Sequence, residues 1–132
     1  MLYNHGASNH SSLVIDRIKN IHQGGNHSDL QGCLKLKKGY SNIYGNLSED
    51  KPTSTITGNC GCASAPGRFL HPKQNRVITV REAARFQSFP DFVIFSENQT
   101  MQYKQVGNAV PSLLSKAVAY KIKKSLVSLE EV

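Results

Sequence analysis

The chain lacks the features of membrane-inserted and secreted proteins. None of its 132 residues lies in an apolar run long enough to span a bilayer, and the N-terminal MLYNHGASNHSS has no apolar core of the signal-peptide kind. Cysteine is scarce: Cys33, Cys60 and Cys62 form an odd set, which argues against a disulfide framework. We therefore expect a cytoplasmic protein with reduced thiols.

Paired zinc ligands and acidic residues are also lacking. Cys60, Cys62 and His71 are three potential zinc ligands, but there is no Cys-x-x-Cys pair and no obvious fourth ligand, so we predict no metal site. Nine Asp and Glu stand against sixteen Lys and Arg, which gives a formal charge of +7. This balance favours a polyanionic partner, although basic proteins that bind no nucleic acid are also common.

A capped helix is predicted to start at residue 79. Thr79 and Glu82 have capping-box spacing, in which the hydroxyl accepts from the third helical amide and the carboxylate accepts from the cap's own amide. Good helix formers follow. Pro90 disfavours helical geometry at Phe89, so the helix is expected to end there.

The sequence QVGNAVP, residues 105–111, predicts a turn between two helices. Gly107 is suited to a positive-φ position after a brief helical run, and Pro111 to the first position of the next helix. Asn108 and Ala109 are then expected at a helix entrance, where unpaired amides point outward and can bind an anionic group. Residues 111–126 predict a strong helix with a wide apolar face.

RVITVREAARFQSFPD (76–91) and QVGNAVP, in this order and this close together, resemble the last two conserved blocks of the DNA (cytosine-5)-methyltransferases. The resemblance implies S-adenosyl-L-methionine as cofactor and places three residues over its site: Gly107, Asn108 and Ala109. It also implies a structural set that organises the recognition domain against the rest of the enzyme. Together with the residues at which the predicted helix begins and ends, this structural set is Thr79, Arg81, Glu82, Arg85 and Pro90.

The first half of the chain resembles the target-recognition region of the same family. An Asn-His pair, a helix predicted over 13–21 with Ser12 as its cap, and a Gly-Gly pair resemble the start of that region in one branch. Residues 40–59 resemble its next segment, with Asn46 where we expect Arg and Ser54 where we expect Pro. Short strands are predicted over 53–57 and 76–79.

Two segments are candidates for contact with DNA. The lysines near 35–38 are either a solvated surface or phosphate contacts. The Gly-rich loop 58–72 is expected to be irregular, and Arg68 either pairs with guanine in the major groove or contacts a phosphate or a carboxylate. The predicted DNA-binding residues are Lys35, Lys37, Lys38, Tyr40, Thr55, Thr57, Asn59 and Arg68.

The catalytic nucleophile of the family follows a proline, and none of the three cysteines does. The Glu-Asn-Val block and the glycine-rich cofactor block are also missing. The resemblance thus implies the C-terminal portion of the enzyme, as a split subunit or a truncated piece. This portion is expected to be inactive alone, because cytosine methylation needs a thiolate that attacks C6 of the flipped base.

The predicted fold class is α+β. A small target-recognition region of short strands and loops, 1–75, precedes the two blocks and a C-terminal helix, 76–128, and a frayed tail, 129–132. The helices would complete the missing α/β methyltransferase domain. Expected partners are double-stranded DNA, the N-terminal catalytic portion and a second copy through the 111–126 helix, in a restriction–modification context. The alternatives are a non-catalytic DNA-binding relic and a basic α+β binding domain.

Overall fold

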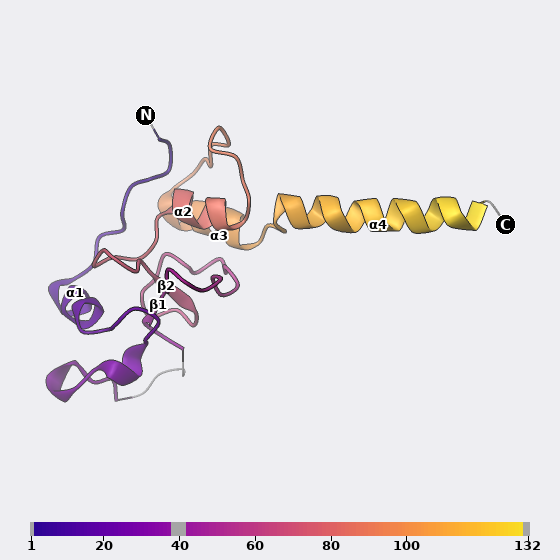
Figure 1. Ribbon diagram of the computed structural model, residues 1–132. Helices are drawn as coiled ribbons and strands as arrows, with labels where there is room; N and C mark the ends of the chain where they lie inside the picture. Colours follow the sequence, from indigo (N-terminus) through magenta and orange to yellow (C-terminus); the bar gives the residue numbers. More distant parts are fainter. Residues whose placement is uncertain (1, 38–41, 131–132) are drawn as a thin grey trace.

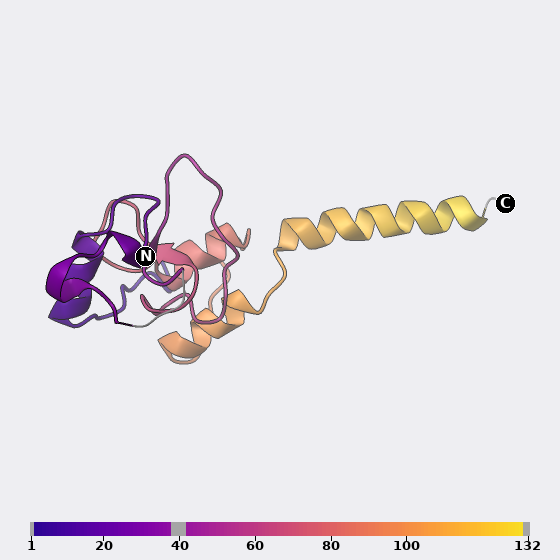
Figure 2. The ribbon, with the colours of Figure 1, turned by 90° about the horizontal axis from the view of Figure 1, so that it is seen from below.

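The computed structural model describes residues 2–37 and 42–130, in which a body of short helices, loops and two strands carries one projecting helix (Figures 1 and 2). The elements agree with the predicted α+β class. In chain order they are α1 (Ser12–Lys19), the 3-10 helices η1 (His27–Asp29) and η2 (Gly32–Leu34), β1 (Gly45–Asn46), β2 (Arg68–Leu70), α2 (Val80–Phe86), α3 (Gln99–Gly107) and α4 (Ser112–Glu130).

The sheet is small and differs from the prediction. β1 and β2 pair in parallel, with Gly45 opposite Arg68. The strand predicted over 76–79 is reduced to an isolated antiparallel bridge between Val77 and Leu70. The strand predicted over 53–57 is wrong, because these residues have no partner strand, and β-branched side chains favour a strand only when it can pair.

Helix α1 confirms the predicted N-terminal helix, although it begins one residue earlier and ends two residues earlier than the predicted range 13–21. Ser11, not Ser12, is the N-cap residue. Ile18 and Ile21 are buried, and Val14 packs at the edge of the same cluster. This cluster also contains Leu70, so the apolar side of α1 covers the end of β2.

A second core joins the two predicted regions. It combines residues before and after position 75: Leu47, Ile56, Cys60, Ala65, Phe69, Ile78, Val80, Ala83, Ala84, Tyr103 and Val106. Because neither region has this core by itself, α2 and α3 form one folding unit with the loops before them.

The start of α2 confirms the predicted capping box, but its end does not follow the prediction. The helix stops at Phe86, a turn before Pro90. Ser88 has φ 58, its amide donates to the Arg85 carbonyl (2.9 Å), and the Phe89 amide donates to the Ala84 carbonyl (2.9 Å). This is a Schellman motif with serine in the position usually taken by glycine.

The turn after α3 also differs from the prediction. Gly107 is the last residue of α3 and has no positive φ; a Cβ there would come closer than 3.0 Å to the backbone of Thr57 and Gly58. Asn108 is the C-cap of α3, not part of a helix entrance. Pro111 lies one position before α4, whose residue Ser115 donates to the Pro111 carbonyl.

Helix α4 extends away from the body (Figure 1). Its side chains from Ser112 to Val127 are exposed, so it does not pack back on the recognition region. The helix continues to Glu130, which places the first residues of the predicted frayed tail inside it. In the part of the chain that the structure describes, no helix is long and apolar enough to cross a membrane.

Candidate functional site

The candidate site is a groove beside the turn at residues 107–111. The end of α2, the extended segment 53–56 and the start of α4 surround a cavity of about 420 Å³. Its walls include Gln87, Gly107, Ala109, Val110 and Leu114. The segments at 53–56 and at the end of α2 therefore meet at this turn, for which the resemblance implies a role in closing the cofactor site.

Gln87 fixes this turn to α2. The side chain is 8% exposed, and its Nε2 donates to the carbonyls of Val106 (3.2 Å) and Ala109 (3.1 Å). The Gln87 side-chain amide thus binds both the last turn of α3 and the residue that follows the C-cap of α3. A polar residue next to a predicted helix end is the type that binds free carbonyls, which is the signal in the sequence for this role of Gln87.

Two backbone amides of the turn, those of Asn108 and Ala109, are already hydrogen-bonded within the protein. The Asn108 amide donates to the Lys104 carbonyl (3.0 Å), and the Ala109 amide donates to the Val106 carbonyl (3.2 Å). The Asn108 side chain is different: the residue is exposed and, within the described residues, its carboxamide has no hydrogen-bond partner. This side chain is therefore available to a ligand.

A partly buried ion-pair network stands at the start of α2. Arg76 donates through both terminal nitrogens to Glu82 (2.7 and 2.8 Å), which also accepts from the Thr79 amide (2.7 Å). Burial would raise the pKa of Glu82, but these donors outweigh it and bring that pKa to about 2. Burial lowers the pKa of His71, whose Nε2 lies 3.8 Å from the Glu82 carboxylate.

Arg81 joins three separate segments. Its side chain is fully buried and donates to the carbonyls of Tyr3, Pro90 and Val93. Asn4 exchanges two hydrogen bonds with the Phe95 backbone (2.9 and 3.0 Å) beside it. The N-terminal segment around Tyr3 and Asn4 is thus fixed to the loop after α2.

Arg85 is different from Arg81, because it is on the surface. It pairs with Asp91 in a two-pronged contact (2.8 and 2.6 Å), and both side chains are about half exposed. Pro90 precedes this aspartate and supplies a carbonyl to Arg81. The loop after α2 is therefore attached to the helix from both sides.

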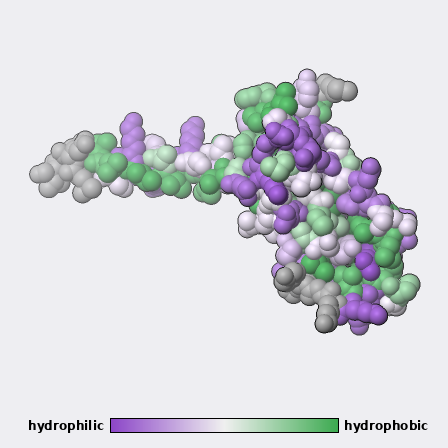
Figure 3. Space-filling view, turned by 180° about the vertical axis from the view of Figure 1, so that it is seen from behind, coloured by the Kyte–Doolittle hydropathy of each residue, from purple (hydrophilic) through white to green (hydrophobic). Residues whose placement is uncertain are grey.

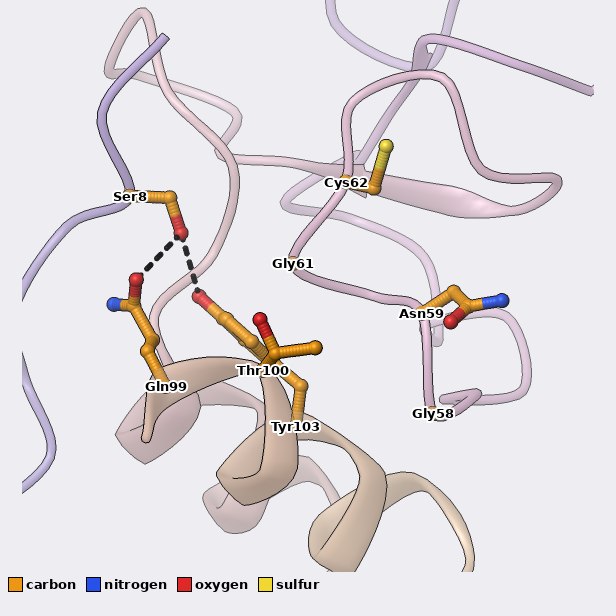
Figure 4. Close-up of a pocket in the computed structure, with 8 residues that line it drawn as sticks. All are labelled: Ser8, Gly58, Asn59, Gly61, Cys62, Gln99, Thr100 and Tyr103. Carbon is orange, nitrogen blue, oxygen red and sulfur yellow. Dashed lines mark hydrogen bonds between the residues drawn. The ribbon is translucent and has the colours of Figure 1, made fainter. Parts of the chain in front are cut away.

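A second, smaller cavity of about 150 Å³ lies between the loop 57–62 and α3 (Figure 4). Ser8 is within hydrogen-bond distance of Gln99 (3.3 Å) and of the Tyr103 hydroxyl (3.4 Å). The side chains of Asn59 and Cys62 come from the loop and point away from Tyr103. The loop thus presents Asn59 outward while its backbone lies on the helix.

Arg68 is turned into the protein. Its Nη1 donates to the carbonyls of Gly24, Gly25 (3.2 Å) and Asn46 (3.1 Å). Arg68 Nη1 thus binds carbonyls of the protein itself, and the pairing of Arg68 with guanine and its contact with a phosphate or a carboxylate stay predictions. Asn46, at the position where we expect an arginine, is itself buried and donates to the Ile21 carbonyl (3.2 Å).

The other predicted DNA-binding residues lie on the surface where the structure describes them. The exposed members are Lys35, Lys37, Thr55, Thr57 and Asn59. Lys38 and Tyr40 fall outside the described residues. The structure therefore brings Thr55, Thr57 and Asn59 together in one segment and leaves the lysines on another.

The cysteines are arranged differently from a metal site. Cys60 is fully buried, and burial raises the pKa of its thiol to about 12. Cys33 and Cys62 are exposed. Within the described residues no group of three His, Cys, Asp or Glu side chains lies together as a metal site requires.

Apolar side chains are unusually exposed along α4 (Figure 3). We call them the α4 stripe: Leu113, Leu114, Val118, Tyr120 and Ile122, each between 50% and 68% exposed. Val110, 63% exposed, continues this surface toward the groove. Large apolar patches of this kind mark protein interaction sites.

The chain is similar to known DNA methyltransferases. A family model described as C-5 cytosine-specific DNA methylase matches residues 3–124. The chain is 37% identical to the type II methyltransferase M1.HphI of Haemophilus parahaemolyticus over 90% of its length and 30% of that protein's. It is 36% identical to the type II methylase M.HgiDII of Herpetosiphon aurantiacus over 96% of its length and 39% of that protein's.

A mammalian relative is similar over a shorter range. The chain is 45% identical to DNA (cytosine-5)-methyltransferase 1 of Mus musculus over 67% of its length and 6% of that protein's. The chain thus spans 30% and 39% of the lengths of these two bacterial relatives. Since the family model covers nearly all of it, the chain belongs to the C-5 cytosine-specific DNA methylase family.

Proposed function

We propose that the chain is the target-recognition and cofactor-closing C-terminal portion of a DNA (cytosine-5)-methyltransferase. The observation that carries this proposal is the groove at residues 107–111, which opens beside an α4 stripe that the body does not cover. A second protein surface that packs on the stripe would also close the groove. The N-terminal catalytic portion of the enzyme is the partner that fits this role.

S-adenosyl-L-methionine is the cofactor that members of the family use. In the proposal, Gly107, Asn108 and Ala109 form one wall of its site, and the free Asn108 carboxamide supplies a donor and an acceptor. Ala109 and Val110 add apolar wall to the same groove. The donor set fits a polar, uncharged part of a ligand better than an anion, because the amides of Asn108 and Ala109 are already bonded.

Double-stranded DNA is the proposed substrate. The segment with Thr55, Thr57 and Asn59 provides side chains for base or phosphate contacts, and Lys35 and Lys37 provide charge. Arg68 contributes by fixing the strand that follows this loop to the turn at residues 24–25. This chain's share of the reaction is therefore to bind and orient DNA and to close the cofactor site.

Methyl transfer tests the proposal. The purified chain alone is expected to transfer no methyl group from labelled S-adenosyl-L-methionine to DNA, because none of its cysteines follows a proline as the family's nucleophile does. Co-expression with an N-terminal portion that carries the Pro-Cys nucleophile and the glycine-rich cofactor loop is expected to restore transfer. Transfer by the chain alone, or its absence from a folded complex of both portions, would contradict the proposal.

A further inference from the structure

Three glycines, Gly58, Gly61 and Gly107, lie where the loop 57–62 meets α3. A Cβ on Gly107 would come closer than 3.0 Å to the backbone of Thr57 and Gly58, and a Cβ on Gly61 would overlap the Tyr103 ring. These glycines do not have positive φ. Glycine is therefore needed at positions 61 and 107 for close approach, and the loop backbone lies directly on the helix.

Helix α3 is itself firmly attached. The Tyr103 hydroxyl donates to the Ile78 carbonyl (2.8 Å) in the segment that leads to α2, and Val106 is fully buried. Gln87 binds the Val106 carbonyl from α2. Because α3 is held at its middle and near its C-terminal end, it is a rigid support for the loop that lies on it.

The loop is ordered by short-range turns above this support. The Cys60 amide donates to the Thr57 carbonyl (3.0 Å), and the Cys62 amide donates to the Asn59 carbonyl (3.0 Å). Cys60 is 0% exposed and belongs to the same core as Tyr103 and Val106. The Cys60 side chain therefore anchors the loop, while Asn59 points outward (Figure 4).

We propose that α3 positions the loop 57–62 for DNA, and that Gly107 couples this loop to the turn that closes the cofactor site. Tyr103 and Gly107 are then positioning residues for Asn59. The proposal rests on the proposed function for the identity of the two ligands. Because Gly107 ends α3 and contacts the loop backbone, a shift of the turn is transmitted to the loop without an intermediate side chain.

Thiol labelling of Cys60 tests the attachment. In a chain with Cys33→Ser and Cys62→Ser, Cys60 is the remaining thiol and is expected to react slowly with a disulfide reagent. Gly107→Ala is expected to speed labelling by about tenfold or more, since the new methyl group separates loop and helix. Gly58→Ala is the matched control, because its Cβ would lie 3.4 Å from Lys104 Cα, an ordinary contact.

Hydrogen exchange separates loop release from general unfolding. The amides of α2 are expected to keep their protection in Gly107→Ala while those of 57–62 lose it. If Gly107→Ala does not fold, Tyr103→Phe takes its place, since it keeps the ring on Gly61 and removes the bond to the Ile78 carbonyl. Equal labelling rates in the tested variant and in Gly58→Ala would overturn the proposal.

DNA binding is the second readout. Gly107→Ala is expected to weaken duplex binding in proportion to loop release, whereas Gly6→Ala is expected to leave it unchanged, because a Cβ there meets no atom within 4 Å. DNA binding that is unaffected by a released loop contradicts the positioning role. Failure of the unsubstituted chain to bind DNA contradicts the proposed function instead, and the Cys60 rates still decide whether α3 holds the loop.

Discussion

At the scale of single residues, the strongest electrostatic feature is the Glu82 carboxylate between Arg76 and the Thr79 amide. Its pKa of about 2 lies below the ordinary value of 4.5, so its contribution to stability is present above pH 4.5 and is lost as pH falls toward 2. A difference of that size corresponds to on the order of 3 kcal/mol.

Glu82→Gln is therefore expected to lower the free energy of unfolding at pH 7 by about 2–3 kcal/mol and to flatten its dependence on pH below 4.5. Urea unfolding between pH 7 and pH 3 measures both. Glu49→Gln is the control, because Glu49 is an exposed residue paired with Lys73 and should change stability little. Parallel pH curves for Glu82→Gln and the unsubstituted chain would show that the network does not stabilise the fold.

The sequence predicts this cap because a capping box depends only on residues three positions apart. It does not predict the position of Arg68, whose partners Gly24, Gly25 and Asn46 are 22 to 44 residues away. The same holds for Arg81 and the Tyr3 carbonyl. An arginine in a loop can bind a phosphate, a base or a carbonyl, and only the tertiary contacts distinguish these uses.

Asn108→Ala tests the assignment of the turn to the cofactor. In an enzyme reconstituted from both portions, it is expected to weaken S-adenosyl-L-methionine binding by about fivefold, the loss of one hydrogen bond, and to leave DNA affinity unchanged. Asn59→Ala is expected to do the reverse. Calorimetry with each ligand separates the two, and impaired DNA binding with normal cofactor affinity in Asn108→Ala would show that the turn serves the other ligand.

At the scale of elements, the sequence predicts helix starts better than helix ends. Pro90 is a strong stop signal, but α2 ends earlier because Ser88 adopts a left-handed conformation and bonds to the start of α4. The Ser88 hydroxyl accepts from the Leu113 amide (3.1 Å), which is an orphan donor of α4. A tertiary contact thus overrides the local signal.

The α4 stripe makes a prediction about association. Apolar surface that remains in water costs about 25 cal/mol per Å², so the isolated chain is expected to self-associate through α4. Leu114→Lys with Val118→Lys should abolish concentration-dependent sedimentation. The thermal transition of the body should not move, because the described part of α4 is exposed along its length.

Ser115→Lys with Ala119→Lys is the matched control, since it adds the same charge at exposed positions outside the stripe. These substitutions should leave association in place. A lower unfolding temperature for the stripe variant alone would show that α4 packs on the body in solution. If both variants lose association equally, the loss is caused by the added charge and not by the removal of apolar surface.

At the scale of the whole molecule, one core unites segments that the resemblance assigns to different parts of an enzyme. Ile56, Cys60 and Phe69 pack with Ala83 and Val106 across position 75. The sequence predicts the order of the segments but not this shared core, because the strand predicted over 53–57 does not form and the buried side chains of 53–62 follow no regular period. The loop therefore depends on α2 and α3 for its shape.

The net charge of +7 predicts electrostatic binding to DNA. Binding of the isolated chain to nonspecific duplex is expected to be roughly micromolar or weaker and to fall steeply with salt, because phosphate contacts dominate. Lys35→Ala with Lys37→Ala should reduce the slope of log affinity against log salt by about 1.8. Lys116→Ala with Lys121→Ala removes the same charge from exposed positions on α4 and should change the slope much less. Titration at several salt concentrations measures this, and equal reductions by both pairs would show that DNA responds to net charge alone and not to the surface that carries Lys35 and Lys37.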